Sequence, residues 1–279
     1  MDPRRLVLRA LLVTLPVALA GCATGLVARS DGPPSTGSDP AFAFQNKRLA
    51  PLEGPHIIAP AALRDGDILL SAEAAPLSSG IRLFTLAPVS HAAVYVGEGE
   101  VAEALGGGVR LRTVARMLDE ESVIAVFRHP QLDAAAAQRI RDTARSRIGL
   151  HYDYVSTFLY IPFALQRHAC ELPVLPAFLR GACVTVLARV QLGLPGPKDR
   201  FFCSSFVLDA YADAGVPLTT ARSTWHSPAD IMHMREGDVA ALPVKQPLVY
   251  VGHLKTTPWA TDSASPADPI SGQAGTDRP

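Results

Sequence analysis

The sequence predicts an α+β fold in which a small antiparallel sheet packs against helices. Three observations favour this class. Short apolar runs separated by turn residues cluster between residues 66 and 128, an amphipathic segment follows at 132–148, and a second apolar helical pattern begins at Cys203. With 48% hydrophobic and 19% charged residues, the 279-residue chain has the composition of one globular domain with appendages.

The predicted strands follow one another closely and alternate with turn residues. Residues 91–96 and 101–104 are two of them, and Glu98-Gly99 between them is typical of a tight hairpin turn. Residues 109–112 alternate apolar and basic side chains, which favours a half-exposed edge strand. The remaining strands are expected at 66–71, 122–128 and 248–251.

Helices are predicted from apolar residues at helical spacing. The segment 132–148 is rich in alanine and arginine and should cover the sheet, whereas 155–165 is strongly apolar. Shorter helices are expected at 78–86 and 228–234, in addition to the one that begins at Cys203.

The N-terminus has the features of an export signal. Arg4 and Arg5 precede an apolar run, residues 6–19, that is too short and too interrupted to span a bilayer. The run ends in Leu19-Ala20-Gly21-Cys22, which resembles the lipobox of bacterial lipoproteins. We therefore expect residues 1–21 to be a signal peptide and Cys22 to become the lipidated first residue of the mature protein.

The segments on either side of the domain should lack a core. Residues 22–54 are rich in turn formers and are expected to be a lipidated tether, and residues 256–279 are expected to be a disordered tail. The folded domain is thus predicted over 55–255. Ala23 follows the lipidated cysteine in place of the aspartate that retains enteric lipoproteins at the inner membrane. This favours the outer membrane, with the domain facing the periplasm.

The formal net charge is zero, so no basic field points to nucleic acid as a partner. The membrane is expected to hold the protein through the lipid on Cys22 rather than through charge.

An exported protein meets an oxidising compartment, where cysteines pair. Cys170 and Cys183 lie 13 residues apart, and a disulfide between them would staple an irregular excursion at 167–198. Cys203 would then be the free thiol. Pairing of Cys183 with Cys203 is also compatible with the sequence.

Cys203 stands where an aromatic, strand-like approach becomes a helix. Unpaired backbone N–H groups in a first helical turn favour a thiolate, the form that attacks carbonyl carbon. The alternative is a buried, inert cysteine that packs as a small hydrophobe.

A cysteine nucleophile needs a base, and His91 is the best placed of eight histidines. A tight turn near residue 97 would set His91 nearly opposite Glu103 on the same face of the hairpin. The carboxylate would then fix the tautomer and orientation of the imidazole.

Six short segments, in this order along the chain, resemble the permuted NlpC/P60 cysteine peptidases of the papain-like superfamily, in the YaeF/YiiX-like branch. The segments are 66–70 (GDILL), 90–97 (SHAAVYVG), 101–104 (VAEA), 149–154 (GLHYDY), 202–207 (FCSSFV) and 227–231 (SPADI). The histidine hairpin precedes the cysteine helix, which is the reverse of the ordinary order in the wider family. The resemblance implies a circularly permuted papain-like fold.

The resemblance also implies roles for four residues. Cys203 would be the nucleophile, His91 the base and later the acid, and Glu103 the orienting group, while Tyr152 would donate to the oxyanion beside the Cys203 backbone N–H. The implied substrate is an amide bond in a peptidoglycan stem peptide. Ser205 departs from the glutamate of many relatives, and the long apolar excursion at 167–198 is a second departure.

Two other functions are compatible with the sequence. The same residues could act on a lipid or another acylated molecule as an amidase, esterase or acyltransferase, or the fold could serve as a non-catalytic envelope lipoprotein that only binds. No cofactor and no metal are expected, because His226 and His233 flank Pro228 without a third ligand.

Overall fold

The computed structural model describes residues 24–28, 40–51, 54–73, 87–172, 175, 177–192 and 200–256. The signal segment, Cys22, the tail and the helix expected at 78–86 lie outside these residues. In chain order the strands are β1 (Thr24–Ala28), β2 (Pro40–Phe44), β3 (Ile68–Glu73), β4 (His91–Tyr95), β5 (Glu100–Leu105), β6 (Gly108–Thr113), β7 (Glu121–Arg128), β8 (His151–Tyr152), β9 (Arg200–Phe201) and β10 (Val249–Lys255).

The described helices are α3 (Val114–Glu120), α4 (Ala134–Ser146), α5 (Tyr154–Cys170), α6 (Ala177–Leu192), α7 (Cys203–Asp213) and α8 (Pro228–Met232), with 3-10 turns η1 (Pro60–Ala62) and η2 (Ser223–Trp225). Among them, none has both the length and the apolar character needed to cross a bilayer.

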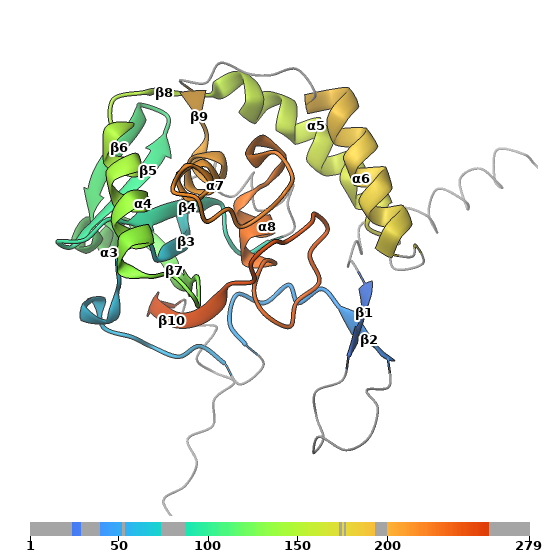
Figure 1. Ribbon diagram of the computed structural model, residues 1–279, viewed down its shortest axis with the longest axis horizontal. Helices are drawn as coiled ribbons and strands as arrows, with labels where there is room; N and C mark the ends of the chain where they lie inside the picture. Colours follow the sequence, from blue (N-terminus) through green and yellow to red (C-terminus); the bar gives the residue numbers. More distant parts are fainter. Residues whose placement is uncertain are drawn as a thin grey trace, which may run out of the picture.

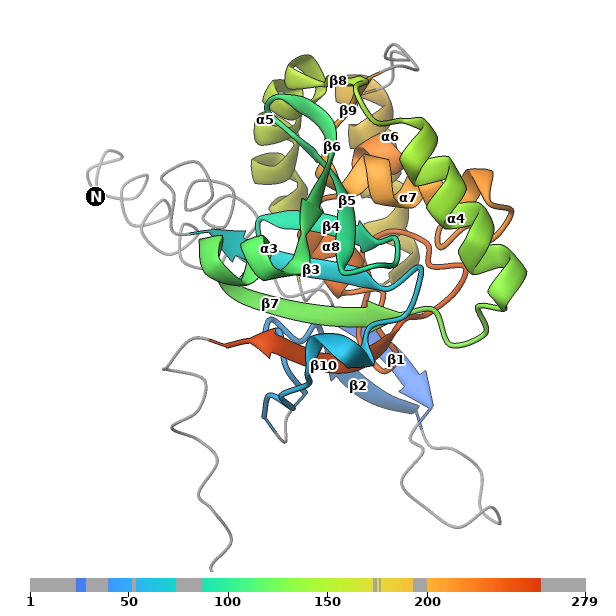
Figure 2. The same ribbon diagram turned by 90° about the vertical axis from the view of Figure 1, so that its left-hand side faces the viewer.

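The centre of the fold is a six-stranded sheet in the order β10-β7-β3-β4-β5-β6, in which every neighbouring pair is antiparallel. Figure 2 shows α4 and α7 over one face of this sheet, with β10 at one edge. The predicted α+β class, a small antiparallel sheet packed against helices, is confirmed.

Both faces of the sheet are buried, because successive side chains of a strand point to opposite sides. Ile68 and Leu70 of β3 pack into the main core with Phe206 and Tyr211 of α7. Leu69 belongs instead to a smaller core that includes Val114 and Met117 of α3 and Ile124 of β7. This double burial explains the continuous apolar run of β3.

Gly66, two residues before β3, is a point of contact with helix α7, which begins at Cys203. Its φ of +87° is a conformation that L side chains rarely adopt, and a Cβ there would lie 2.5 Å from the side chain of Leu132. The hydroxyl of Tyr211, on α7, donates to the Gly66 carbonyl. Helix α7 is therefore fixed against the sheet by a buried hydrogen bond as well as by apolar packing.

The C-terminal part of the expected tether, residues 22–54, is packed against the domain in the structure. Strands β1 and β2 pair as an antiparallel hairpin, and residues 45–51 run along the domain. The side chain of Arg235 donates to the carbonyls of Asn46, Arg48 and Leu49. The packed part of the chain thus begins about ten residues before the predicted boundary at 55, because these backbone carbonyls find a buried guanidinium.

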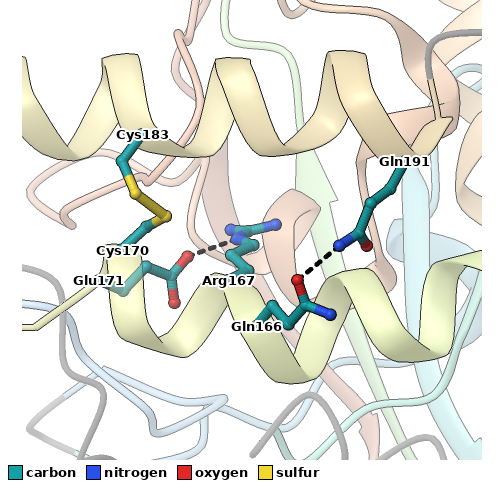
Figure 3. The surroundings of a disulfide bond; sticks show 6 residues. All are labelled: Gln166, Arg167, Cys170, Glu171, Cys183 and Gln191. Carbon is teal, nitrogen blue, oxygen red and sulfur yellow. Dashed lines mark hydrogen bonds and ion pairs between the residues drawn. A yellow bond between two sulfur atoms is a disulfide. The ribbon is translucent and has the colours of Figure 1, made fainter.

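The excursion at 167–198 is helical rather than irregular over its described residues. Helix α5 continues to Cys170 and α6 packs beside it, on the side of the molecule away from α4 (Figure 1). Figure 3 shows a disulfide between Cys170 and Cys183, with an S–S distance of 2.03 Å, and a hydrogen bond of 2.6 Å from Gln191 to Gln166. The two helices are therefore connected by a covalent bond as well as by side-chain contacts.

We predict that, of the three cysteines in the described residues, only Cys203 is a titratable thiol in the denatured chain without reductant. Reduction should expose Cys170 and Cys183 as well, and replacing both by alanine should lower the free energy of unfolding by about 3 kcal/mol, the value for a loop of this length. Thiol titration with peptide mapping, together with denaturant unfolding, measures both. A free thiol at Cys170 or Cys183 before reduction would contradict the pairing.

Candidate active site

Cys203 is the first residue of α7, as the sequence predicts. Strand β9 leads into it, and Phe202 has extended backbone angles, φ −106° and ψ 168°. The Ser205 hydroxyl accepts from the Phe202 N–H at 3.1 Å and thereby caps the helix start. The thiol is free and buried, at a point where the helix dipole favours negative charge.

The imidazole of His91 lies between a carboxylate and the thiol. Its Nε2 is 2.8 Å from Glu103 Oε2, and its side chain also hydrogen-bonds with Cys203. Because Nε2 faces Glu103, Nδ1 is the ring nitrogen left for the sulfur. The three side chains come from β4, β5 and the start of α7.

The register of the β4–β5 hairpin differs from the expected one by two residues. Glu103 pairs directly with Ala93, and His91 pairs with Ser71 of β3 on its other side. The turn is longer than expected, because Gly97, Glu98 and Gly99 all have positive φ and Glu100 N–H donates to the Gly97 carbonyl. The equal parity of residues 91 and 103 still puts them on one face, so they meet diagonally.

Two arginines on β6 contact Glu103 and were missed as site residues. Arg110 pairs with it across the sheet and lies 3.0 Å from Oε1, and Arg112 lies 3.0 Å from Oε2. Arg112 is buried and also contacts Glu120 and Glu121. Strand β6 is an edge of the sheet, and both of its arginines contact the carboxylate, although the Arg110 side chain remains 44% exposed. The signal for this was the cross-strand pairing of opposite charges.

The charges of this cluster support one another. Burial by itself lowers the pKa of His91, but the hydrogen bonds to Cys203 and Glu103 and the Glu103 charge outweigh it and raise the pKa to about 10. Burial likewise raises the pKa of Glu103, but His91, Arg112 and Arg110 outweigh it and lower the pKa to about 2. At neutral pH the site therefore holds an imidazolium beside an ionised carboxylate.

Tyr152 lies next to the chain that leads into α7. It pairs with Phe201 in the short parallel ladder of β8 and β9, and Asp153 N–H donates to the Phe201 carbonyl at 2.9 Å. The Tyr152 ring contacts that of Tyr154, with centroids 4.9 Å apart. Its pairing partner, Phe201, thus lies two residues before Cys203.

A second buried ionic cluster joins the α5–α6 hairpin to α8. Arg167 of α5 contacts Asp230 through both terminal nitrogens and Glu171 through Nε at 2.5 Å. Asp230 also accepts from the Ser227 N–H at 2.7 Å in the cap of α8, and the Tyr160 hydroxyl lies 3.3 Å from it. The motif at 227–231 therefore holds the excursion in place.

No group of three or more His, Cys, Asp or Glu side chains in the described part of the chain is arranged to hold a metal ion. The two histidines considered for a metal have other contacts. His226 Nδ1 is 2.9 Å from the Arg222 carbonyl, and His233 Nδ1 is 2.9 Å from Asp238.

Comparisons relate the chain to known proteins. Residues 62–160 match the family described as "Permuted papain-like amidase enzyme, YaeF/YiiX, C92 family". The "Probable lipoprotein peptidase YaeF" of Escherichia coli (strain K12) is 42% identical over 195 residues, which is 69% of this chain and 71% of that protein. A crystal structure of the metalloprotein yiiX from Escherichia coli O157:H7 is similar with a TM-score of 0.38 and 16% identity, over 72% of this chain and 92% of that chain.

Proposed function

Because the chain belongs to the permuted papain-like amidase family and is a cysteine peptidase or amidase, we propose that Cys203, His91 and Glu103 are its catalytic triad. The observation that carries the proposal is the position of the His91 imidazole, hydrogen-bonded to Glu103 on one side and to Cys203 on the other. That arrangement supplies a nucleophile, a proton carrier and an orienting carboxylate in contact.

In the acylation step, the Cys203 sulfur bonds to the carbonyl carbon and the carbonyl π electrons move to oxygen. The Cys203 backbone N–H and the Tyr152 hydroxyl would stabilise that oxyanion. The intermediate collapses, the C–N bond breaks, and His91 gives its proton to the leaving amine.

In the deacylation step, His91 takes a proton from water, and the resulting hydroxide attacks the thioester carbon. The C–S bond breaks, which releases the carboxylic acid and returns the thiolate. Glu103, fixed by Arg110 and Arg112, keeps Nε2 occupied so that Nδ1 stays directed at the reaction.

The proposed substrate is an amide in the peptide stem of peptidoglycan, and the proposed location is the cell envelope. Removal of residues 1–21 would leave Cys22 lipidated, with the tether and the catalytic domain on the periplasmic side and the anchor in the outer membrane. The name of the relative, a probable lipoprotein peptidase, supports a lipid anchor and a peptide substrate.

Mass spectrometry of reaction products tests the substrate class. Wild type and Cys203→Ala are incubated with defined muropeptides and, in parallel, with acyl amides and esters. Cleavage of a muropeptide amide by wild type alone would support the proposal. Cleavage of acyl compounds alone would favour lipid or acyl chemistry, and binding without cleavage in every arm would favour a binding lipoprotein.

We predict that Glu103→Gln lowers kcat/KM by roughly a hundredfold or more, because the imidazole loses its anionic partner. The pKa of His91 should fall, since Glu103 contributes to raising it, and the alkaline limb of the rate profile should move to lower pH. Imidazole NMR titration and pH–rate profiles measure the two effects.

Glu103→Gln should also change how the free energy of unfolding depends on pH. The folded-state pKa of Glu103 is depressed from 4.5 to about 2, so its contribution is present above about pH 4.5 and is lost as pH falls toward 2. Wild type should therefore be more stable than Glu103→Gln at neutral pH by a margin that shrinks in acid. An unchanged rate with an unchanged His91 titration would remove Glu103 from the triad.

A further inference from the structure

Helix α6 is mostly apolar and has no distinct polar side, yet one side of it is exposed. Its inner side packs with Phe163 of α5 and Trp225 of η2 through Val184 and Ala188. Leu179, Ala182, Val186 and Val190 recur at helical spacing and define its outer face. This face is open to solvent, since the exposed fraction is 61% for Val186 and 79% for Val190. A mostly apolar helix without a distinct polar side is ordinarily covered on both sides.

Exposed apolar side chains are concentrated on this part of the molecule. Of the eight large ones in the described residues, five lie on α5 and α6, namely Tyr154, Leu165, Leu179, Val186 and Val190. Scattered single residues of this kind need no explanation, but a run along one helix marks an interaction surface.

The charge of the segment favours a lipid surface over other partners. Residues 172–198 contain no aspartate or glutamate. The one exposed cation on α6 is Arg189, next to Val190, whereas Arg180 is buried. An apolar face with arginine at its border is the pattern of helices that lie in the membrane interface, where the guanidinium reaches the headgroups.

The position of α6 also fits the way the chain reaches the domain. Gln45 and Lys47, which follow the β1–β2 hairpin, line one cavity together with Tyr160, Ala164 and His168 of α5. In Figure 1 the β1–β2 hairpin and α6 lie at the same side of the molecule, away from α4. An anchor at the N-terminus would hold this side toward the bilayer.

We propose that the outer face of α6 docks on the lipid bilayer surface. The disulfide between Cys170 and Cys183 and the buried Arg167–Asp230 pair keep the hairpin rigid, so docking fixes the orientation of the whole domain. The active site would then work at a set distance from the membrane, which a flexible tether alone does not impose.

Depth-dependent quenching tests the proposal on the lipidated full chain. In a Cys203→Ala background, Val190→Cys is labelled with a nitrobenzoxadiazole dye and reconstituted into phosphatidylethanolamine and phosphatidylglycerol vesicles with or without doxyl-labelled lipid. The control is Ala135→Cys, on the exposed side of α4. We expect several-fold stronger lipid quenching at position 190 than at 135.

A charge at the face gives a second readout. In the Val190→Cys chain, Val186→Glu should abolish most of the quenching, whereas Val186→Leu should retain it. Equal quenching at 190 and 135 would overturn the proposal, even if flotation shows that the chain is anchored. So would a chain that fails to float with vesicles, or a concentration-dependent emission shift at 190 without lipid quenching, which would indicate a second copy of the chain on this face.

Discussion

Replacing Cys203 by alanine is expected to reduce hydrolysis roughly a thousandfold or more, because no other described cysteine is a free thiol. Covalent labelling by an electrophilic thiol probe at neutral pH should disappear with it. The side chain is small and its removal leaves the Ser205 cap intact, so the thermal midpoint should change little. Probe labelling followed by peptide mapping, with turnover measured in parallel, checks the prediction.

A serine at the same position is the matched variant. Cys203→Ser keeps approximately the volume and the hydrogen-bonding capacity but replaces the sulfur with a less nucleophilic hydroxyl oxygen, so turnover should stay low. Persistent labelling of Cys203→Ala at another cysteine, or turnover near the wild-type rate in either variant, would refute the nucleophile assignment.

Replacing Arg167 by methionine is expected to lower the free energy of unfolding by about 3–5 kcal/mol. The variant retains most of the volume but leaves Asp230 and Glu171 buried without their cation. The matched control is Arg141→Met, because the Arg141–Asp65 pair has a comparable contact of 2.9 Å but is partly exposed. Its loss should cost less than about 1 kcal/mol. Denaturant unfolding at neutral pH measures both variants.

At acid pH, Arg167→Met should lower the free energy of unfolding by less than it does at neutral pH. Burial raises the pKa of Asp230, but the Arg167 charge and hydrogen bonds outweigh it and hold that pKa well below its usual range. The contribution of a depressed carboxyl is present above its unfolded pKa and is lost as pH falls through the folded one. The difference between wild type and Arg167→Met should therefore narrow below about pH 4. If Arg167→Met and Arg141→Met lowered the free energy of unfolding by the same amount at neutral pH, the stabilising role of the buried Arg167–Asp230 pair would be contradicted.

The positions of Cys203 and His91 could be predicted from the sequence because both depend on local patterns. A helix start at Cys203 follows from apolar spacing, and a shared face for His91 and Glu103 follows from parity, which survives a shift of register by two residues. The exact register did not follow, since it depends on whether Gly97 joins the turn. Residues 97–99 can adopt positive φ, as they do in the structure, but their sequence does not require it.

The parts that could not be predicted depend on contacts between distant segments. Arg110 and Arg112 alternate with apolar residues in a way that is typical of an exposed edge, and their contacts with Glu103 on the neighbouring strand depend on the strand register. Helix α3 was not expected at all, because its short sequence has weak periodicity and is stabilised by packing of Met117 under the sheet.

The order of the elements determines when a growing polypeptide acquires a reactive centre. Synthesis proceeds from the N-terminus, so the β4–β5 hairpin with His91 and Glu103 is complete roughly a hundred residues before Cys203 is added. Any fragment that contains this hairpin but terminates before Cys203 carries His91 and Glu103 without the proposed nucleophile. If the cysteine helix preceded the hairpin, a prematurely ended chain would contain that cysteine without the histidine and the glutamate. The permuted order avoids such a fragment.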